Sequence, residues 1–146
     1  MNLTLKAADT IADAALERGR ELDCDPLTVA VLDPGGHVKV LKRQDGAGIL
    51  RCEIAIGKAW GALGMGLPSR ELGRRAKERP EFFGALASLA GGRVLPAAGG
   101  VLVLSADEEV IGAVGVSGDT SDRDEDCALR GIAAAGLSSN PPPAQS

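Results

Sequence analysis

The sequence predicts an α/β protein of the α+β type, with an antiparallel sheet of about five strands and helices packed on it. Apolar residues recur every three or four positions in stretches near both ends of the 146-residue chain, which is typical of amphipathic helices. Between these stretches lie short runs rich in β-branched residues, bounded by glycine, proline or acidic turns. The order is helix, two strands, helices, three strands, helix, which favours helices on one antiparallel sheet.

The first third of the chain predicts a helix and then a β-hairpin. Residues 4–22 place their apolar side chains on one helical face. Residues 27–33 (LTVAVLD) form an apolar run that ends at a Pro-Gly-Gly turn, and residues 37–43 (HVKVLKR) alternate between polar and apolar. Because only a tight turn separates the two runs, we expect them to pair as a hairpin.

A long helix is expected over residues 50–66, and three of its glycines share one face: Gly57, Gly61 and Gly64. Glycine destabilises a helix by roughly 1 kcal/mol relative to alanine, so a shared glycine face indicates that another backbone approaches closely. Either the next helix of the same chain or a second subunit would fit against it.

The second half of the chain predicts two short helices and three strands. One helix has Ser69 as its N-cap, and the other has Pro80 in its first turn. Residues 91–105 (GGRVLPAAGGVLVLS) predict a strand, a glycine-rich turn and another strand. Residues 110–117 (VIGAVGVS) predict the last strand.

A final helix is expected to begin at Ser121. Its first turns carry four carboxylates, which favour the positive end of the helix dipole: Asp122, Asp124, Glu125 and Asp126. We expect residues 1–137 to form a single domain. Residues 138–146 (SSNPPPAQS) are expected to be a disordered, proline-rich tail.

Charge and cysteine content exclude several classes of protein. Twenty acidic residues outnumber sixteen basic ones, so we expect no nucleic-acid partner and no membrane partner. No run reaches the roughly 18–20 apolar residues that a membrane span requires, and the N-terminus lacks the apolar core of a signal peptide. Three cysteines without a CxxC pair fit a reducing compartment, so a cytoplasmic location is expected.

Two carboxylates and the single histidine are candidate catalytic residues. His37 follows a two-glycine turn and could exchange a proton near neutral pH, with Asp33 or Asp45 as its partner. The alternatives are a histidine that only bonds to the turn and, for Asp45, a local ion pair with Arg43.

Three basic side chains are candidate anchors for an anionic ligand: Arg43, Lys58 and Arg93. Lys58 lies in an otherwise apolar helix and could equally pair with a carboxylate such as Asp33 or Asp45. Backbone groups near strand ends could hold a carboxylate or propionate, at Gly99, Gly100 and Ser117. No metal site is expected, because the acidic cluster does not match an EF-hand and no zinc pattern is present.

Four segments together resemble the GlcG/HbpS-like family, which includes heme-binding proteins and C-terminal domains of corrinoid adenosyltransferases. They are DPGGHVKVLKRQDGA (33–47), EIAIGKAW (53–60), RVLPAAGGV (93–101) and IGAVGVSGDTSDRDE (111–125). The resemblance extends from the first helix to about Leu137. It implies a profilin-like fold and assembly into homo-oligomers.

The resemblance implies a small-molecule-binding protein whose ligand is a tetrapyrrole such as heme. Heme iron is usually held by His, Cys, Met or Tyr, and the chain has one His, no Tyr and one internal Met, Met65. Aromatic residues make up only 2% of the chain, so a second subunit would have to supply part of a heme site. The alternative is a small cofactor-free enzyme that performs isomerase, lyase or hydrolase type acid/base chemistry on an organic acid.

Overall fold

The computed structural model describes residues 2–143, which form five helices around a five-stranded antiparallel sheet of order β2-β1-β4-β3-β5. The helices are α1 (Leu5–Glu21), α2 (Arg51–Met65), α3 (Ser69–Glu78), α4 (Pro80–Leu89) and α5 (Ser121–Ala134). The strands are β1 (Thr28–Leu32), β2 (Val38–Arg43), β3 (Gly100–Leu104), β4 (Val110–Ser117) and β5 (Ser138–Asn140). The expected α+β architecture is confirmed.

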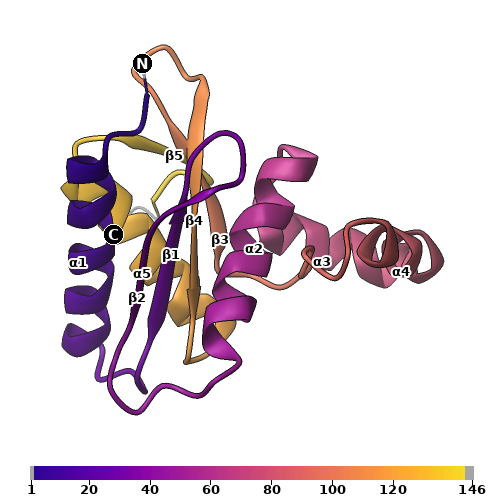
Figure 1. Ribbon diagram of the computed structural model, residues 1–146, viewed down its shortest axis with the longest axis horizontal. Helices are drawn as coiled ribbons and strands as arrows, with labels where there is room; N and C mark the ends of the chain where they lie inside the picture. The colour runs from indigo at the N-terminus through magenta and orange to yellow at the C-terminus, as the bar shows by residue number, and fades with distance from the viewer. Residues whose placement is uncertain (1, 144–146) are drawn as a thin grey trace.

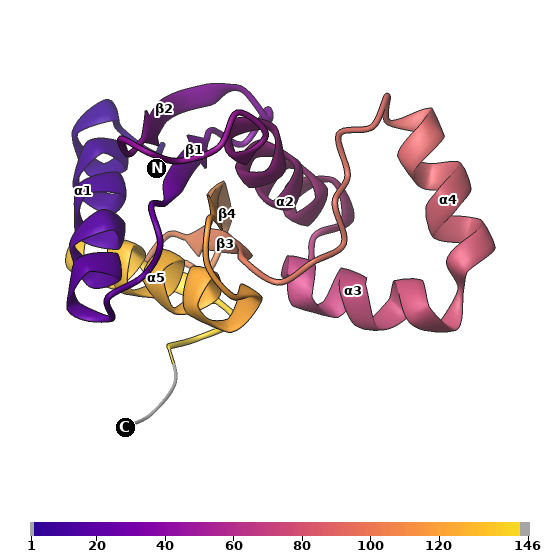
Figure 2. The same ribbon diagram turned by 90° about the horizontal axis from the view of Figure 1, so that it is seen from below.

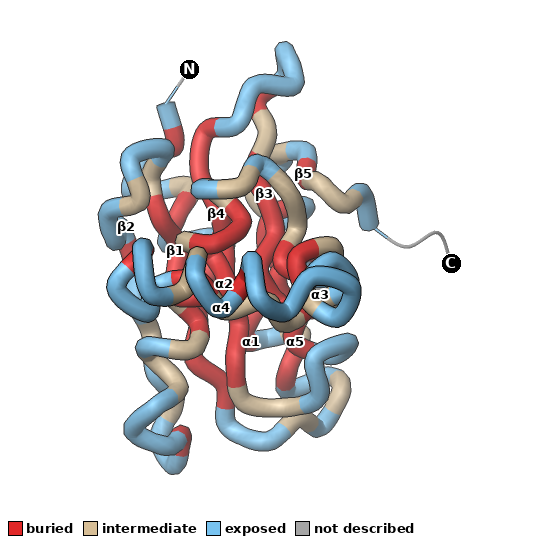
Figure 3. The backbone as a smooth tube through the Cα atoms, turned by 90° about the vertical axis from the view of Figure 1, so that its right-hand side faces the viewer, coloured by how far each residue is buried: buried red, intermediate tan, exposed pale blue. Residues whose placement is uncertain are grey.

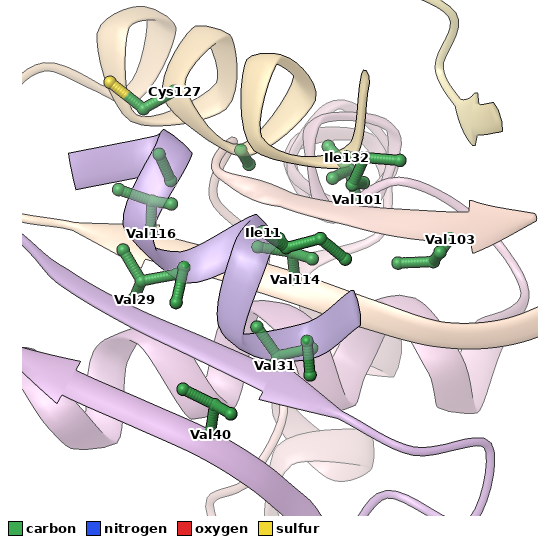
Figure 4. Packing of buried hydrophobic residues seen from close by; sticks show 14 of the residues in the cluster. Ile11, Val29, Val31, Val40, Val101, Val103, Val114, Val116, Cys127 and Ile132 are labelled. Atoms are coloured by element: carbon green, nitrogen blue, oxygen red, sulfur yellow. The ribbon is translucent and has the colours of Figure 1, made fainter. Parts of the chain in front are cut away.

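The sheet is covered on both faces (Figure 1). Helices α1 and α5 pack on one face, and α2 packs on the other. Consequently every residue of the interior strand β1 is buried, whereas the edge strand β2 is mostly exposed. The larger core lies under α1 and α5, where Ile11 meets Val29, Val31 and Val114 of the sheet (Figure 4).

Helices α3 and α4 form an arm that extends beyond α2 and away from the sheet (Figure 2). Most of this arm is exposed (Figure 3). Phe83 is the one buried residue of α4, while Phe82 and Leu89 leave 43% and 85% of their surface exposed. The arm therefore presents apolar side chains that the described part of the chain does not cover.

The predicted N-terminal helix and hairpin are confirmed. The Thr4 hydroxyl caps α1 by accepting a hydrogen bond from the Ala7 amide at 3.1 Å. Strands β1 and β2 pair antiparallel, with one register shift beside Leu32. Gly36 adopts a φ of 83° in the turn, a conformation that glycine reaches without strain.

The first strand expected within residues 91–105 is absent, and only β3 forms there. The preceding segment instead runs along α2, where the Leu95 amide donates to the Gly57 carbonyl at 3.2 Å. A Cβ atom added to Gly57 would lie 3.2 Å from Leu95, and one added to Gly61 would lie 3.1 Å from Val94. The backbone that approaches Gly57 and Gly61 is therefore the segment before β3 rather than the next helix of the chain.

Two further expectations at element ends were wrong. Ser69 is the first residue of α3 rather than its cap, because its hydroxyl bonds to both main-chain groups of Gly100. Ser138–Asn140, expected in the disordered tail, form β5 and pair with β3, with Ser139 buried. The unpaired edge of β3 needs hydrogen-bond partners, and β5 supplies them. The last three residues of the expected tail, 144–146, lie outside the described residues.

Candidate functional site

A cavity of about 230 Å³ lies between α2 and α4, and its walls are apolar apart from one guanidinium. The lining residues are Trp60, Gly64, Met65, Leu86, Leu89, Ala90, Arg93 and Val94. Helix α2 supplies the aromatic ring and the thioether, α4 supplies the leucines, and the segment after α4 supplies the arginine. An apolar pocket with a few convergent polar groups is the usual form of a small-molecule site.

Trp60 connects this cavity to the β-hairpin turn. The Arg93 guanidinium carbon lies 4.2 Å from the centroid of the Trp60 ring, which is a cation–π contact. The indole also touches the turn, because a Cβ atom on Gly36 would lie only 2.7 Å from its Nε1 atom. The ring is thus held between Arg93 and the turn, and Arg93 presents its charge beside the cavity.

Asp33 and His37, the candidate proton carriers of the hairpin turn, make mainly local contacts within that turn. Asp33 Oδ1 accepts hydrogen bonds from the amides of Gly35 (2.9 Å) and His37 (3.0 Å), and the His37 amide bond is the main cause that lowers the pKa of Asp33. His37 Nδ1 lies 3.4 Å from the same oxygen, and its side chain is 83% exposed. His37 is not among the residues that line the cavity between α2 and α4.

Lys58 is paired, and its partner is a carboxylate that sequence reasoning had assigned only to helix capping. Its Nζ atom lies 3.1 Å from Asp124 Oδ2 and 2.9 Å from the Val116 carbonyl oxygen. Lys58 and Asp124 are 4% and 1% exposed. Burial raises the pKa of Asp124, although Lys58 and the hydrogen bond from the Asp119 amide favour its ionised form. Lys58 therefore pairs with a carboxylate, as one of its two alternatives had it, but the partner is Asp124 rather than Asp33 or Asp45.

The predicted backbone sites pack against the neighbouring helices. Gly99 has a φ of 128°, and a Cβ atom there would lie 2.8 Å from Lys58 Nζ. The Gly100 amide donates to the Ser69 hydroxyl at 2.7 Å. The buried Ser117 hydroxyl accepts from Arg51 at 3.1 Å. These groups pack the sheet against α2 and α3.

Arg43 and Asp45 lie at the opposite end of the hairpin from His37. They line an open groove of about 470 Å³ together with Arg20, Cys24, Pro26 and Gln44. Arg43 donates to the Ala47 carbonyl at 2.8 Å, and the ion pairs within residues 2–143 include none between Arg43 and Asp45. Arg43 and Arg93 therefore line different cavities, and neither His37 nor Lys58 lines either of them.

The acidic cluster of α5 is divided among three cations. Asp124 pairs with Lys58, Asp126 with Arg18, and both Asp122 and Glu125 with Arg70. Within the described chain, no three His, Cys, Asp or Glu residues are grouped closely enough to hold a metal ion. None of the described helices is both long and apolar enough to cross a membrane.

The model of the family described as "Haem degrading protein HbpS-like" matches residues 3–133. This chain belongs to the HbpS-like family. An uncharacterised 15.0 kDa protein of Citrobacter freundii, from the dhaT-dhaS intergenic region, is 30% identical to this HbpS-like chain over 122 residues, which is 84% of each protein. The corrinoid adenosyltransferase PduO of Salmonella typhimurium is 34% identical over 121 residues. That match covers 83% of this chain but only 35% of PduO.

The fold of this HbpS-like chain is also that of a solved heme complex. The crystal structure of the PduOC–heme complex superimposes with a TM-score of 0.85 at 30% sequence identity. The match covers 94% of this chain and 97% of the PduOC chain.

The lining of the cavity between α2 and α4 combines apolar side chains with one guanidinium and one thioether. Met65 is the one lining residue whose side chain is of a type that ligates heme iron. Cys127 is buried, and burial raises its thiol pKa to about 12, so it is poorly suited to metal binding. Sequence reasoning named Arg93 but did not group it with Trp60, Met65 and the α4 leucines, because only the arm brings them together.

Proposed function

We propose that this HbpS-like protein binds a tetrapyrrole of the heme type in the cavity between α2 and α4. The observation that carries the proposal is the meeting of the Trp60 ring, the Met65 thioether and the Arg93 guanidinium in one apolar cavity. A heme complex of a relative with the same fold supports this choice of ligand.

Each lining group has a distinct role in this proposal. Trp60 and the leucines of α4 shield the macrocycle from water, and Arg93 pairs with a propionate. Met65 is the proposed iron ligand. A bound heme would supply an iron centre whose properties depend on its axial ligand and on the polarity of its surroundings.

The cavity is too small to enclose such a ligand by itself. Pockets for drug-sized ligands have volumes of about 300–1,000 Å³, against about 230 Å³ here. Leu89, which lines the cavity, is 85% exposed, and Phe82 of the same helix is 43% exposed. We therefore propose that the protein is a homo-oligomer in which a second copy covers the α2–α4 face. We propose a cytoplasmic location on the same grounds of charge and cysteine content as above.

Titration with hemin tests the ligand and the iron-binding residue together. The expected result is a saturable Soret band for the unaltered protein, a shifted and weaker band for Met65→Ala, and an unchanged band for His37→Ala. A band that is lost in His37→Ala and kept in Met65→Ala would place the ligand elsewhere. Arg93→Gln should weaken hemin binding by about tenfold, the value of one charge-assisted contact of about 1.4 kcal/mol.

The oligomer is tested by mass in solution. The unaltered protein should elute from size exclusion with light scattering as a multimer, whereas Leu89→Glu should shift it towards the monomer. Leu5→Glu is the matched control, because Leu5 is also exposed (61%) but belongs to α1 on the other side of the molecule. A monomeric unaltered protein contradicts the proposal.

A further inference from the structure

A row of polar side chains crosses three strands beneath the start of α2. Thr28 of β1 lies opposite Arg43 of β2 and opposite Ser117 of β4 in the sheet register. Directly opposed residues project from the same face of a sheet, with Cβ atoms about 4.5–5.5 Å apart. Arg43, Thr28 and Ser117 therefore lie side by side on the face that α2 covers, and Arg51 of α2 donates to Ser117 at 3.1 Å.

The Thr28 hydroxyl has no hydrogen-bond partner. Thr28 is fully buried, and its Oγ1 atom is the one buried side-chain polar atom without a partner among residues 2–143. Leaving such a group unpaired costs stability that an apolar residue of the same shape would avoid. The row therefore contains one hydroxyl, that of Thr28, whose hydrogen-bonding capacity is unused within the described chain.

The row also carries positive charge without a matching carboxylate. Arg51 and Arg43 each donate to a neutral oxygen, of Ser117 and of the Ala47 carbonyl. Neither belongs to any ion pair found in the described part of the chain, and the nearby Lys58 is already neutralised by Asp124. Arg43 is exposed, but Arg51 is partly buried, and a partly buried guanidinium usually pairs with a carboxylate or a phosphate.

We infer that this row is a binding site for a small carboxylate anion, separate from the cavity of the proposed function. One carboxylate oxygen accepts from the hydroxyls of Thr28 and Ser117, and the other accepts from Arg51, which leaves Ser117 to do so. Arg51 is only partly buried, so its side chain is the part of the site that can move to admit the ion. Arg51 and Met65 stand at opposite ends of α2, about 21 Å apart at 1.5 Å per residue.

Amide NMR spectra of the labelled protein, titrated with sodium acetate against sodium chloride at equal ionic strength, test this site. Saturable shifts at the amides of Thr28 and Ser117 are expected with acetate only. Arg51→Gln should weaken acetate binding by about tenfold or more, as expected for loss of a charge-assisted contact. Lys39→Gln is the matched control, because Lys39 is an exposed cation on the same strand as Arg43, and it should leave binding unchanged.

Two other measurements keep the test independent of folding and of hemin binding. Thr28→Val keeps the shape of the side chain, so the variant should fold and should bind acetate more weakly than the unaltered protein. A variant that is more stable than the unaltered protein and binds acetate with unchanged affinity refutes the site. Shifts that chloride reproduces also refute it, and tighter binding of inorganic phosphate than of acetate refutes the carboxylate assignment. Met65→Ala should leave the acetate shifts intact, so failure of the heme proposal does not decide this one.

Discussion

Replacing Lys58 by methionine tests the buried ion pair that joins α2 to α5. Met keeps most of the side-chain volume but leaves Asp124, which is 1% exposed, without its cation. Removing one partner of a buried pair typically costs about 3–5 kcal/mol, because an uncompensated charge remains. This is a large fraction of the roughly 5–15 kcal/mol that stabilises an ordinary domain.

The loss should depend on pH with a definite sign. Burial already raises the pKa of Asp124, and Lys58 opposes that rise, so removing Lys58 raises the folded-state pKa further. The folded variant then binds a proton more tightly than the unfolded chain, whose Asp pKa is about 3.9. The destabilisation of Lys58→Met should therefore be largest at neutral pH and should shrink as the pH falls towards that value.

Urea unfolding at pH 7 and at pH 5 measures both effects. Asp124→Asn supplies the second arm, since an asparagine oxygen can still accept from the Asp119 amide. The double variant should be more stable than Lys58→Met alone, because the unpaired carboxylate is gone. A Lys58→Met variant within about 1 kcal/mol of the unaltered protein, or one whose deficit grows in acid, would refute the reasoning.

Three other outcomes follow from the packing. Gly115→Ala should destabilise the fold by about 1–3 kcal/mol or more, because the added Cβ would overlap the carbonyl oxygen of Ala55 in α2. Gly84→Ala, in open space on α4, should instead stabilise the fold by up to about 1 kcal/mol. The same urea assay measures both. Cys127 should resist iodoacetamide until the protein unfolds, because it is buried and its thiol pKa is about 12; mass spectrometry should find Cys52, which is partly exposed, labelled first, and the reverse order would contradict this. Deleting residues 138–146 should cost about 1–3 kcal/mol and promote aggregation seen by light scattering, because β5 protects the edge of β3; unchanged stability would mean that β5 contributes nothing.

The sequence predicts the elements whose pattern is local. The α1 periodicity, the hairpin with its Pro-Gly-Gly turn and the β4 run each carry their own signal, and the structure confirms them. The segment before β3 was predicted as a strand because Val94 and Leu95 are residue types typical of strands, but the Leu95 amide donates to Gly57 of α2 instead. Strand β5 was missed because a serine-rich end has no apolar alternation, and the edge of β3 alone determines its pairing.

Contacts between distant residues were less predictable. Lys58 stood out as an unusual cation in an apolar helix. Its partner Asp124 lies 66 residues further along the chain, where its sequence neighbours indicate only a carboxylate at the start of a helix. In the same way, Met65 and Leu89 line one cavity only because the chain turns back towards α2 after α3 and α4. Residue types indicated the chemistry, whereas the partners depended on the tertiary fold.

The two sides of the proposed heme cavity differ in how firmly they are held. Trp60 and Met65 stand on α2, which contacts the sheet so closely that Gly100 and Gly115 have no room for a side chain. The α4 side buries only Phe83. Segments with few buried contacts open with little free energy, so bound ligand should stabilise α4 far more than α2. Hydrogen exchange of the amides with and without hemin measures this. Slower exchange confined to α4 is expected, and equal protection of both helices would show that α4 is already rigid.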